Sequence, residues 1–230
     1  MPYLSCIYEA PYLYRYEDNV YIDLFFETGK ILISAFQVYR SYDDNQLGDF
    51  DEGKSKFVHN SVDEEIIKSN ATGHMESGKK SYCFCTSTIL DKKLFNTFKR
   101  NWVFRIKDVG NFGMEISKKI EGTTNEMFFG NCIYLNERVL REKVGTIALR
   151  FQPTDTDIKS FEIFSGSLFG SKLLFVKLIK YQSQSEYRML WPNLTNVNCS
   201  LVLDCPGAIK YCEKISTEEV EEVFRHLSIS

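Results

Sequence analysis

The most informative polar residues of the chain come directly after its most apolar segment. Gln184, Glu186 and Arg188 follow the apolar run at residues 173–179 and are spaced two residues apart. If this segment is a β-strand, its period of two places the three side chains on one face. A hydrophobic core has no need of three polar side chains in line, so the pattern indicates a binding or catalytic surface. The alternative is an exposed strand whose Glu186–Arg188 ion pair contributes little to stability.

A second segment combines aromatic and hydroxyl side chains. The run Tyr82-Cys83-Phe84-Cys85 alternates like a half-buried strand and ends in Thr86-Ser87-Thr88. Hydroxyl groups both donate and accept hydrogen bonds, so this strand end can hold a sugar or a backbone amide. The alternative is that one of the three hydroxyl residues caps a helix expected at residues 90–98, with Asp91 adding a favourable charge.

Two arginines stand next to tyrosines: Arg15 in Tyr14-Arg15-Tyr16, and Arg40 in Tyr39-Arg40-Ser41-Tyr42. A guanidinium group at a strand end presents a fixed fork of donors that fits a phosphate. Each arginine is therefore a candidate phosphate ligand. For Arg15 the alternative is a surface arginine at the edge of a core strand.

No segment has the spacing of a metal site. The acidic stretch at residues 43–53 lacks the alternating carboxylates of a calcium-binding loop. The seven cysteines include no C-x-x-C pair, and the three histidines lie far from Cys83 and Cys85. The sequence therefore predicts no metal site, and it predicts thiols that stay reduced in a cytoplasmic protein.

The composition is that of an ordinary globular protein with an excess of aromatic residues. Of the 230 residues, 43% are hydrophobic, 26% are charged and 14% are aromatic, which excludes general disorder. The net charge of −3 removes the argument for a strongly basic nucleic-acid-binding domain. No signal peptide is visible at the N-terminus, and no apolar stretch approaches the length that crosses a membrane. We expect a cytoplasmic protein with no membrane partner.

The pattern of elements predicts one α+β domain over residues 1–230, because short strands and helices follow one another in irregular order. The acidic stretch 42–56 and residues 73–80 are expected to be loops. The strands are expected at residues 12–16, 30–38, 81–87, 102–106 and 128–135, and two more within 173–191. The helices are expected at residues 19–28, 90–98, 111–120 and 157–164, and after the capping boxes at Ser61 and Ser216.

The order of the polar motifs resembles that of toxin-type ADP-ribosyltransferases. In that family an arginine on an early strand is followed by an aromatic strand ending in Ser-Thr-Ser and then by a Gln-x-Glu pair. The corresponding residues are Arg15 or Arg40, the run Thr86-Ser87-Thr88, and Gln184-x-Glu186. The resemblance implies an ADP-ribosyltransferase-like fold, with a mixed or antiparallel split sheet and peripheral helices.

The same resemblance implies NAD as the substrate and gives each residue a role. An arginine would hold the pyrophosphate, a tyrosine would stack on the nicotinamide, and Ser87 would bond the adjoining ribose. Glu186 would stabilise the oxocarbenium-like charge as nicotinamide leaves, while Gln184 would orient the acceptor, a protein side chain or a nucleic-acid base. The NAD-binding residues implied in this way are Arg15, Tyr39, Arg40, Tyr82, Ser87 and Thr88.

A second resemblance covers more of the chain. Segments 24–53, 103–120, 130–134 and 180–188 are similar to a large, poorly characterised bacterial family whose relatives are linked to abortive infection, a form of phage defence. This implies a toxin or phage-defence effector and leaves open a neutralising antitoxin partner. One alternative is a nuclease that holds Mg²⁺ between carboxylates; the other is a non-enzymatic interaction module with an aromatic surface. The nuclease carboxylates would be Asp43, Asp49, Asp51, Glu52 and Glu186.

Overall fold

The computed structural model describes residues 12–41, 49–60, 70–124, 126–142, 172–215 and 218–222. Strands and short helices alternate irregularly along these segments, so the α+β class is confirmed. The elements in chain order are β1 (Leu13–Glu17), α1 (Asn19–Thr28), β2 (Lys30–Ala35), the 3₁₀ helix η1 (Phe36–Arg40), β3 (Lys54–Asn60), β4 (Asn70–Glu76), β5 (Ser81–Ser87), α2 (Lys92–Phe98), β6 (Trp102–Ile106), α3 (Val109–Ser117), β7 (Phe128–Asn131), β8 (Ile133–Leu135), β9 (Val139–Glu142), β10 (Val176–Leu178), the 3₁₀ helix η2 (Ile179–Gln184), β11 (Glu186–Pro192), β12 (Leu201–Asp204), the 3₁₀ helix η3 (Pro206–Tyr211) and β13 (Cys212–Ile215).

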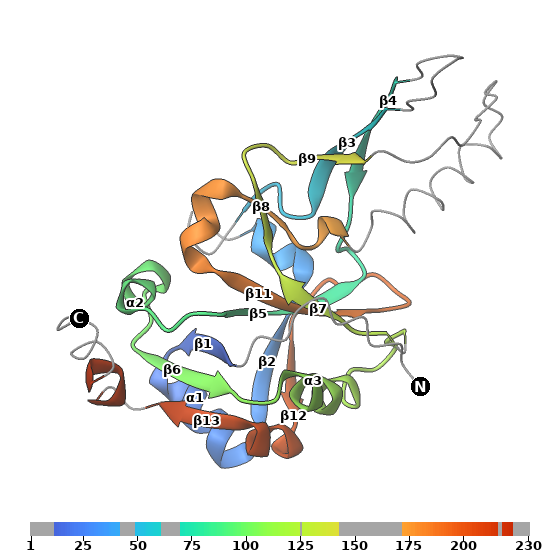
Figure 1. The fold of residues 1–230 in the computed structure, drawn as a ribbon. Helices are drawn as coiled ribbons and strands as arrows, with labels where there is room; N and C mark the ends of the chain where they lie inside the picture. The colour runs from blue at the N-terminus through green and yellow to red at the C-terminus, as the bar shows by residue number, and fades with distance from the viewer. Residues whose placement is uncertain are drawn as a thin grey trace.

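Strand β5 lies at the centre of an antiparallel main sheet, in which β11 lies alongside it and β7 follows β11 (Figure 1). The register between β5 and β11 places Glu186 opposite Ser87. The other edge of β5 is shared by two strands, because β2 pairs with Tyr82 and Cys83 while β1 pairs with Ser87 alone. The sheet therefore forks at β5. One arm continues from β1 to β6 and β13, and the other from β2 to β12.

Helix α1 connects the two arms of this fork. It begins after Asp18 and ends at Gly29, which adopts the left-handed conformation (φ 79°) and donates its N–H to the carbonyl of Phe25 at 2.7 Å. The helix expected at residues 19–28 and the stop expected at Gly29 are confirmed, but the side chain of Asp18, expected as a cap, makes no capping hydrogen bond. The helical spacing of Tyr21, Leu24 and Phe25 predicts that these residues face the core. This is wrong in part, because Ile22 and Phe25 face the core, whereas Tyr21 and Leu24 are exposed.

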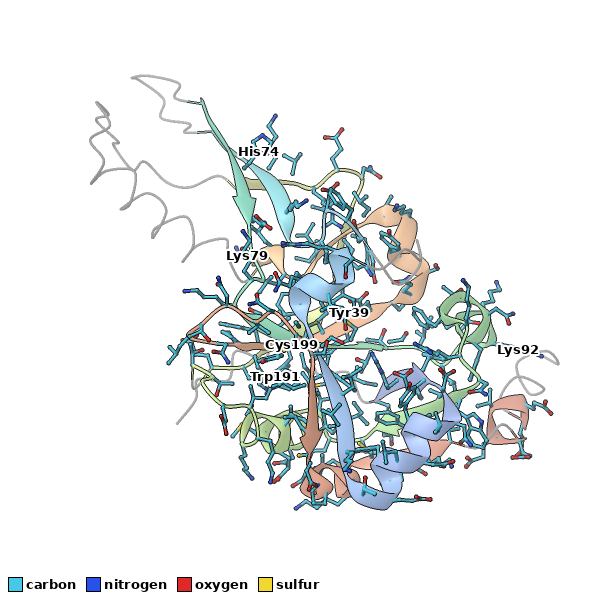
Figure 2. All side chains as sticks on the ribbon, turned by 180° about the vertical axis from the view of Figure 1, so that it is seen from behind. Tyr39, His74, Lys79, Lys92, Trp191 and Cys199 are labelled. Atoms are coloured by element: carbon cyan, nitrogen blue, oxygen red, sulfur yellow. The ribbon has the colours of Figure 1, made fainter. Side chains whose placement is uncertain are left out.

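Both faces of β5 and β11 are covered. Phe84, Met189 and Trp191 belong to the main core, which includes residues of α1 and α3, whereas Cys83 and Leu190 pack against other partners on the opposite face. Figure 2 shows Tyr39 and Trp191 on opposite sides of these strands. The expectation of a half-buried strand at residues 81–87 is therefore wrong, since six of the seven residues are buried.

Several other predicted elements differ from the structure in detail. The strand expected at residues 30–38 ends at Ala35, and the chain continues as η1. Residues 70–76 form β4, where the sequence predicted a loop beyond residue 73, because they pair in register with β3. The arm of β3, β4 and β9 extends away from the main sheet (Figure 1).

The helix expected at residues 90–98 begins at Lys92 and is capped by Asp91, whose carboxylate accepts the N–H of Lys93 at 2.8 Å. None of the three hydroxyl residues of the run 86–88 caps it. The helix expected at residues 111–120 begins earlier, after Asp108. The helices expected after Ser61 and at residues 157–164 lie outside the described residues. In the part of the chain that the structure describes, no helix has the length and hydrophobicity to span a membrane.

Replacing Gly29 with alanine tests the fork, because this residue turns the chain from α1 into β2. A Cβ atom there would lie 2.5 Å from the Cα of Pro206, in a conformation that side chains disfavour. We expect Gly29→Ala to lower the free energy of unfolding by about 2 kcal/mol or more, measured by chemical denaturation. The control is Gly110→Ala on α3, where the nearest atom is 3.8 Å away and stability should not fall. Equal stability of the two variants would contradict the strained turn.

Candidate functional site

A cavity of about 560 Å³ opens where the sheet forks. Its wall is formed by residues of β1, α1, β2, β5 and β11, together with Lys177 from β10. A cavity of this size lies within the range of about 300–1,000 Å³ in which proteins bind small molecules. Of the eight catalytic and NAD-binding residues that the ADP-ribosyltransferase resemblance implies, five line it together: Arg15, Tyr39, Ser87, Gln184 and Glu186.

Three neighbouring strands bring these residues to one place. Ser87 ends β5 and is the residue opposite both Tyr14 on β1 and Glu186 on β11. The hydroxyl of Ser87 donates to the carbonyl of Gln184 at 2.8 Å, which fixes the chain where it enters β11. Residues distant in the sequence, at positions 15, 87 and 186, thus reach the same cavity through antiparallel pairing.

Gln184 reaches the site in a different way from the one predicted. It does not lie on a strand with Glu186 but ends the 3₁₀ helix η2, and Ser185 then turns the chain with a positive φ of 43°. The backbone N–H of Thr88 donates to the carbonyl of Ser185 at 2.9 Å and holds this turn. The side chains of Gln184 and Glu186 meet because both accept hydrogen bonds from Lys177.

The floor of the cavity is a buried network of two cations and two carboxylates. Lys177 Nζ lies 2.5 Å from Glu186 Oε2 and 2.9 Å from the amide oxygen of Gln184. Arg188 Nε lies 2.5 Å from Glu186 Oε1, and its Nη1 lies 2.9 Å from Glu52 Oε1. The formal charges sum to zero, so each buried charge has a partner of opposite sign. The Glu186–Arg188 pair exists as predicted, but the exposed strand of the alternative interpretation is wrong.

Electrostatics keep the carboxylate of Glu186 ionised. Burial alone would raise the pKa of Glu186, but the adjacent charges of Arg188 and Lys177 hold that pKa far below its ordinary value. Burial likewise opposes the charge of Lys177, yet the carboxylate of Glu186 raises the pKa of this lysine above its usual range. Both groups are charged at neutral pH. A carboxylate fixed in this way presents further lone pairs for a ligand hydroxyl and a permanent negative charge.

Arg15 is held at the fork by β5 itself. Neither β1 nor β2 pairs with residues 84–86, and Arg15 Nη1 donates to the open carbonyl of Cys85 at 2.7 Å. The guanidinium group lies 4.9 Å from the centre of the Phe84 ring, and its Nη2 bonds Glu17 at 2.8 Å. The arginine is therefore anchored on one side and faces the cavity on the other.

Three predicted NAD-binding residues do not line the cavity. Arg40 donates to the carbonyls of Glu52 and Ser77 at 2.6 and 2.7 Å, and so joins η1 to the chain at both ends of the β3–β4 hairpin. Tyr82 is buried in the main core. Thr88 donates to the carbonyl of Ser185 at 3.3 Å. Between the two candidate arginines, the structure thus places Arg15 and not Arg40 at the cavity.

Several residues of the site were not expected from the sequence. Lys177 stood out only as a single lysine within an apolar run, which is a usable signal because a buried lysine needs a partner. Glu52 was named only as a metal-binding carboxylate of the nuclease alternative, and its ion pair with Arg188 was not expected. Arg100 and Glu17 reach the cavity from a loop and from the end of β1, and only the fold brings them there.

The carboxylates of the nuclease alternative are engaged by cations. Asp49 pairs with Arg138, Asp51 with Lys54, and Glu52 and Glu186 with Arg188. Asp43 lies outside the described residues. Within the described ranges, no three side chains of the types that bind metals are grouped around a common point.

Comparison of the chain with protein-family models, with curated proteins and with solved structures finds no match in any of the three. Its function is therefore inferred from the residues and the geometry of the cavity.

Replacing Arg188 with methionine tests the buried network. The variant removes the ion pair of the buried Glu52 and leaves Glu186 with Lys177 as its cation, so we expect the free energy of unfolding to fall by about 3–5 kcal/mol. Chemical denaturation at neutral pH measures this difference. The matched control is Lys118→Met, which removes a surface ion pair with Glu115 and should leave stability unchanged. If Arg188→Met has the same free energy of unfolding as the wild type, the buried ion-pair network does not stabilise this part of the structure.

Proposed function

We propose that the chain binds NAD in this cavity and transfers its ADP-ribosyl group to an acceptor. The observation that carries the proposal is the position of Arg15, Ser87 and Glu186, which come from three neighbouring strands and line one cavity. Their order along the chain is the Arg–Ser–Glu order that the sequence shares with toxin-type ADP-ribosyltransferases. The forked sheet supports a split-sheet fold of that kind.

The lining of the cavity suits a dinucleotide. Planar rings of a ligand can stack on aromatic side chains, and its phosphates need cations. Tyr39 faces the cavity from η1, and burial raises the pKa of its hydroxyl, so this ring stays neutral. Arg15 supplies the cation. The aromatic residues of the lining are Tyr14, Tyr16, Tyr21, Phe25, Tyr39, Phe84, Phe98 and Phe104.

The proposed reaction breaks one bond and forms one. The bond between the ribose C1′ and the nicotinamide nitrogen breaks, and its electron pair leaves with neutral nicotinamide. The ribose then carries oxocarbenium-like positive charge, which the ionised carboxylate of Glu186 stabilises. The acceptor attacks C1′, forms the new bond and loses its proton. Gln184, held beside Glu186 by Lys177, orients this acceptor.

The acceptor that we propose is a protein side chain or a nucleic-acid base. Modification of such a target would make the chain a toxin or phage-defence effector in the cytoplasm, as the resemblance to the abortive-infection family implies. A neutralising antitoxin is a consistent partner for such an activity. The net charge of −3 favours neither kind of acceptor.

Glu186→Gln and Ser87→Ala test the proposed reaction through the release of nicotinamide from labelled NAD, with cell lysate as the source of acceptor. We expect the wild type to release nicotinamide in the presence of a chelator, and Glu186→Gln to release it at least about 100-fold more slowly, because the fixed charge is lost. Ser87→Ala leaves the buried charges in place, so it should lose activity while remaining folded.

Thr88→Ala is the matched control for Ser87→Ala. Both hydroxyls bond the Gln184–Ser185 turn, but only Ser87 lines the cavity, so Thr88→Ala should keep its activity. Unfolding curves of every variant separate loss of function from loss of fold. A wild-type protein that neither binds nor consumes NAD would refute the proposal, and cleavage of nucleic acid that stops with EDTA would favour the nuclease instead.

A further inference from the structure

One wall of the cavity carries a carboxylate held by two arginines from different parts of the chain. Glu17 Oε2 lies 2.8 Å from Arg15 Nη2, and Glu17 Oε1 lies 3.3 Å from Arg100 Nε. All three residues line the cavity, and their side chains are between 15 and 29% exposed, so a ligand can reach each of them. A negative group between two guanidinium groups has the charge arrangement of a bound phosphate.

Contacts other than its ion pair with Glu17 hold Arg15 in position, so it can stay in place if another anion replaces Glu17. Its Nη1 donates to the carbonyl of Cys85, and its Cζ lies 4.9 Å from the centre of the Phe84 ring. Only the Nη2 side is committed to Glu17. Exchange of Glu17 for another anion would therefore leave the anchor of the guanidinium group in place.

Asp18 holds Arg100 in a similar way. Asp18 occupies the N-cap position of α1, yet its side chain makes no capping hydrogen bond. It pairs instead with Arg100 Nη1 at 2.5 Å. An aspartate at an N-cap normally accepts a backbone N–H, so here the capping bond is given up to hold the arginine. The positive end of the α1 dipole lies at the same corner and adds to the attraction for anions.

Resting on the proposed function, we propose that Arg15 and Arg100 together bind the diphosphate group of the dinucleotide, and that Glu17 occupies their site until the ligand arrives. Glu17 keeps the two guanidinium groups close together in the absence of ligand, where they would otherwise repel each other. A diphosphate brings two charged groups and offers one to each arginine. Because Glu17 must give up these bonds, it lowers the affinity for every ligand that carries the diphosphate.

The test is the binding of ADP and of adenosine, measured by calorimetry on the full chain. We expect Glu17→Gln to bind ADP at least about fivefold more tightly than the wild type, since a competing charge is removed. We expect Arg100→Gln to bind ADP at least about fivefold more weakly. Adenosine lacks the diphosphate, so its affinity should be unchanged in both variants.

Asp23→Asn and Lys214→Gln are the matched controls. These residues form an ion pair between α1 and β13 that is outside the cavity lining, with side chains 34 and 37% exposed for Lys214 and Asp23. Neither change should alter the affinity for ADP. A purely structural role of Glu17 would lower the unfolding temperature without tightening the binding of ADP, and that result would overturn the inference.

The outcome is independent of catalysis. Tighter ADP binding by Glu17→Gln supports the diphosphate site even if the chain releases no nicotinamide from NAD, and then only the proposed reaction fails. Equal binding of ADP and adenosine, or the absence of ADP binding in both the wild type and Glu17→Gln, overturns the diphosphate site while leaving the reaction to the nicotinamide assay.

Discussion

The buried charge of Arg188 is the interaction on which the site depends. A guanidinium group this far from water needs carboxylates beside it. One strand and one turn supply them: Glu186 comes from β11 itself, and Glu52 comes from the turn before β3. Lys177 supplies the second cation and pairs with Glu186. The pairing of these buried charges joins β10, β11 and the turn before β3. It also fixes the ionised carboxylate of Glu186 at the cavity. The ion pairs that stabilise the fold thus also hold the carboxylate of Glu186 that the proposed chemistry uses.

The fork of the main sheet is the second feature that the site requires. Because β1 and β2 share one edge of β5, they diverge around α1 and leave the carbonyl of Cys85 without a strand partner from either arm. Arg15 satisfies this carbonyl. The same gap in pairing that makes room for a ligand therefore also anchors a cation at its edge. The exposed side chains of Tyr21 and Leu24 line this cavity, which explains why these two apolar residues of α1 do not face the core.

Local signals in the sequence predicted much of the fold, whereas the long-range pairings were not predictable from it. The range of α1 and its end at Gly29 were predictable, since the end of a helix depends mainly on neighbouring residues. The burial of β5 on both faces depends on partners far away in the chain, so the alternation of its residues misled the prediction. The β4 strand was missed for the same reason, because its pairing with β3 and not its composition makes it a strand.

For the site, too, local signals were visible in the sequence, whereas the arrangement of distant residues was not. Glu186 and Ser87 were recognisable from their spacing to other polar residues, but the choice between Arg15 and Arg40 needed the fold. The most direct measurement of the central claim is a crystal structure of the chain with a non-hydrolysable NAD analogue. We expect the nicotinamide-side ribose to lie within hydrogen-bond distance of the Glu186 carboxylate and close to Ser87. An analogue bound elsewhere, or a cavity that excludes it at saturating concentration, would contradict the account.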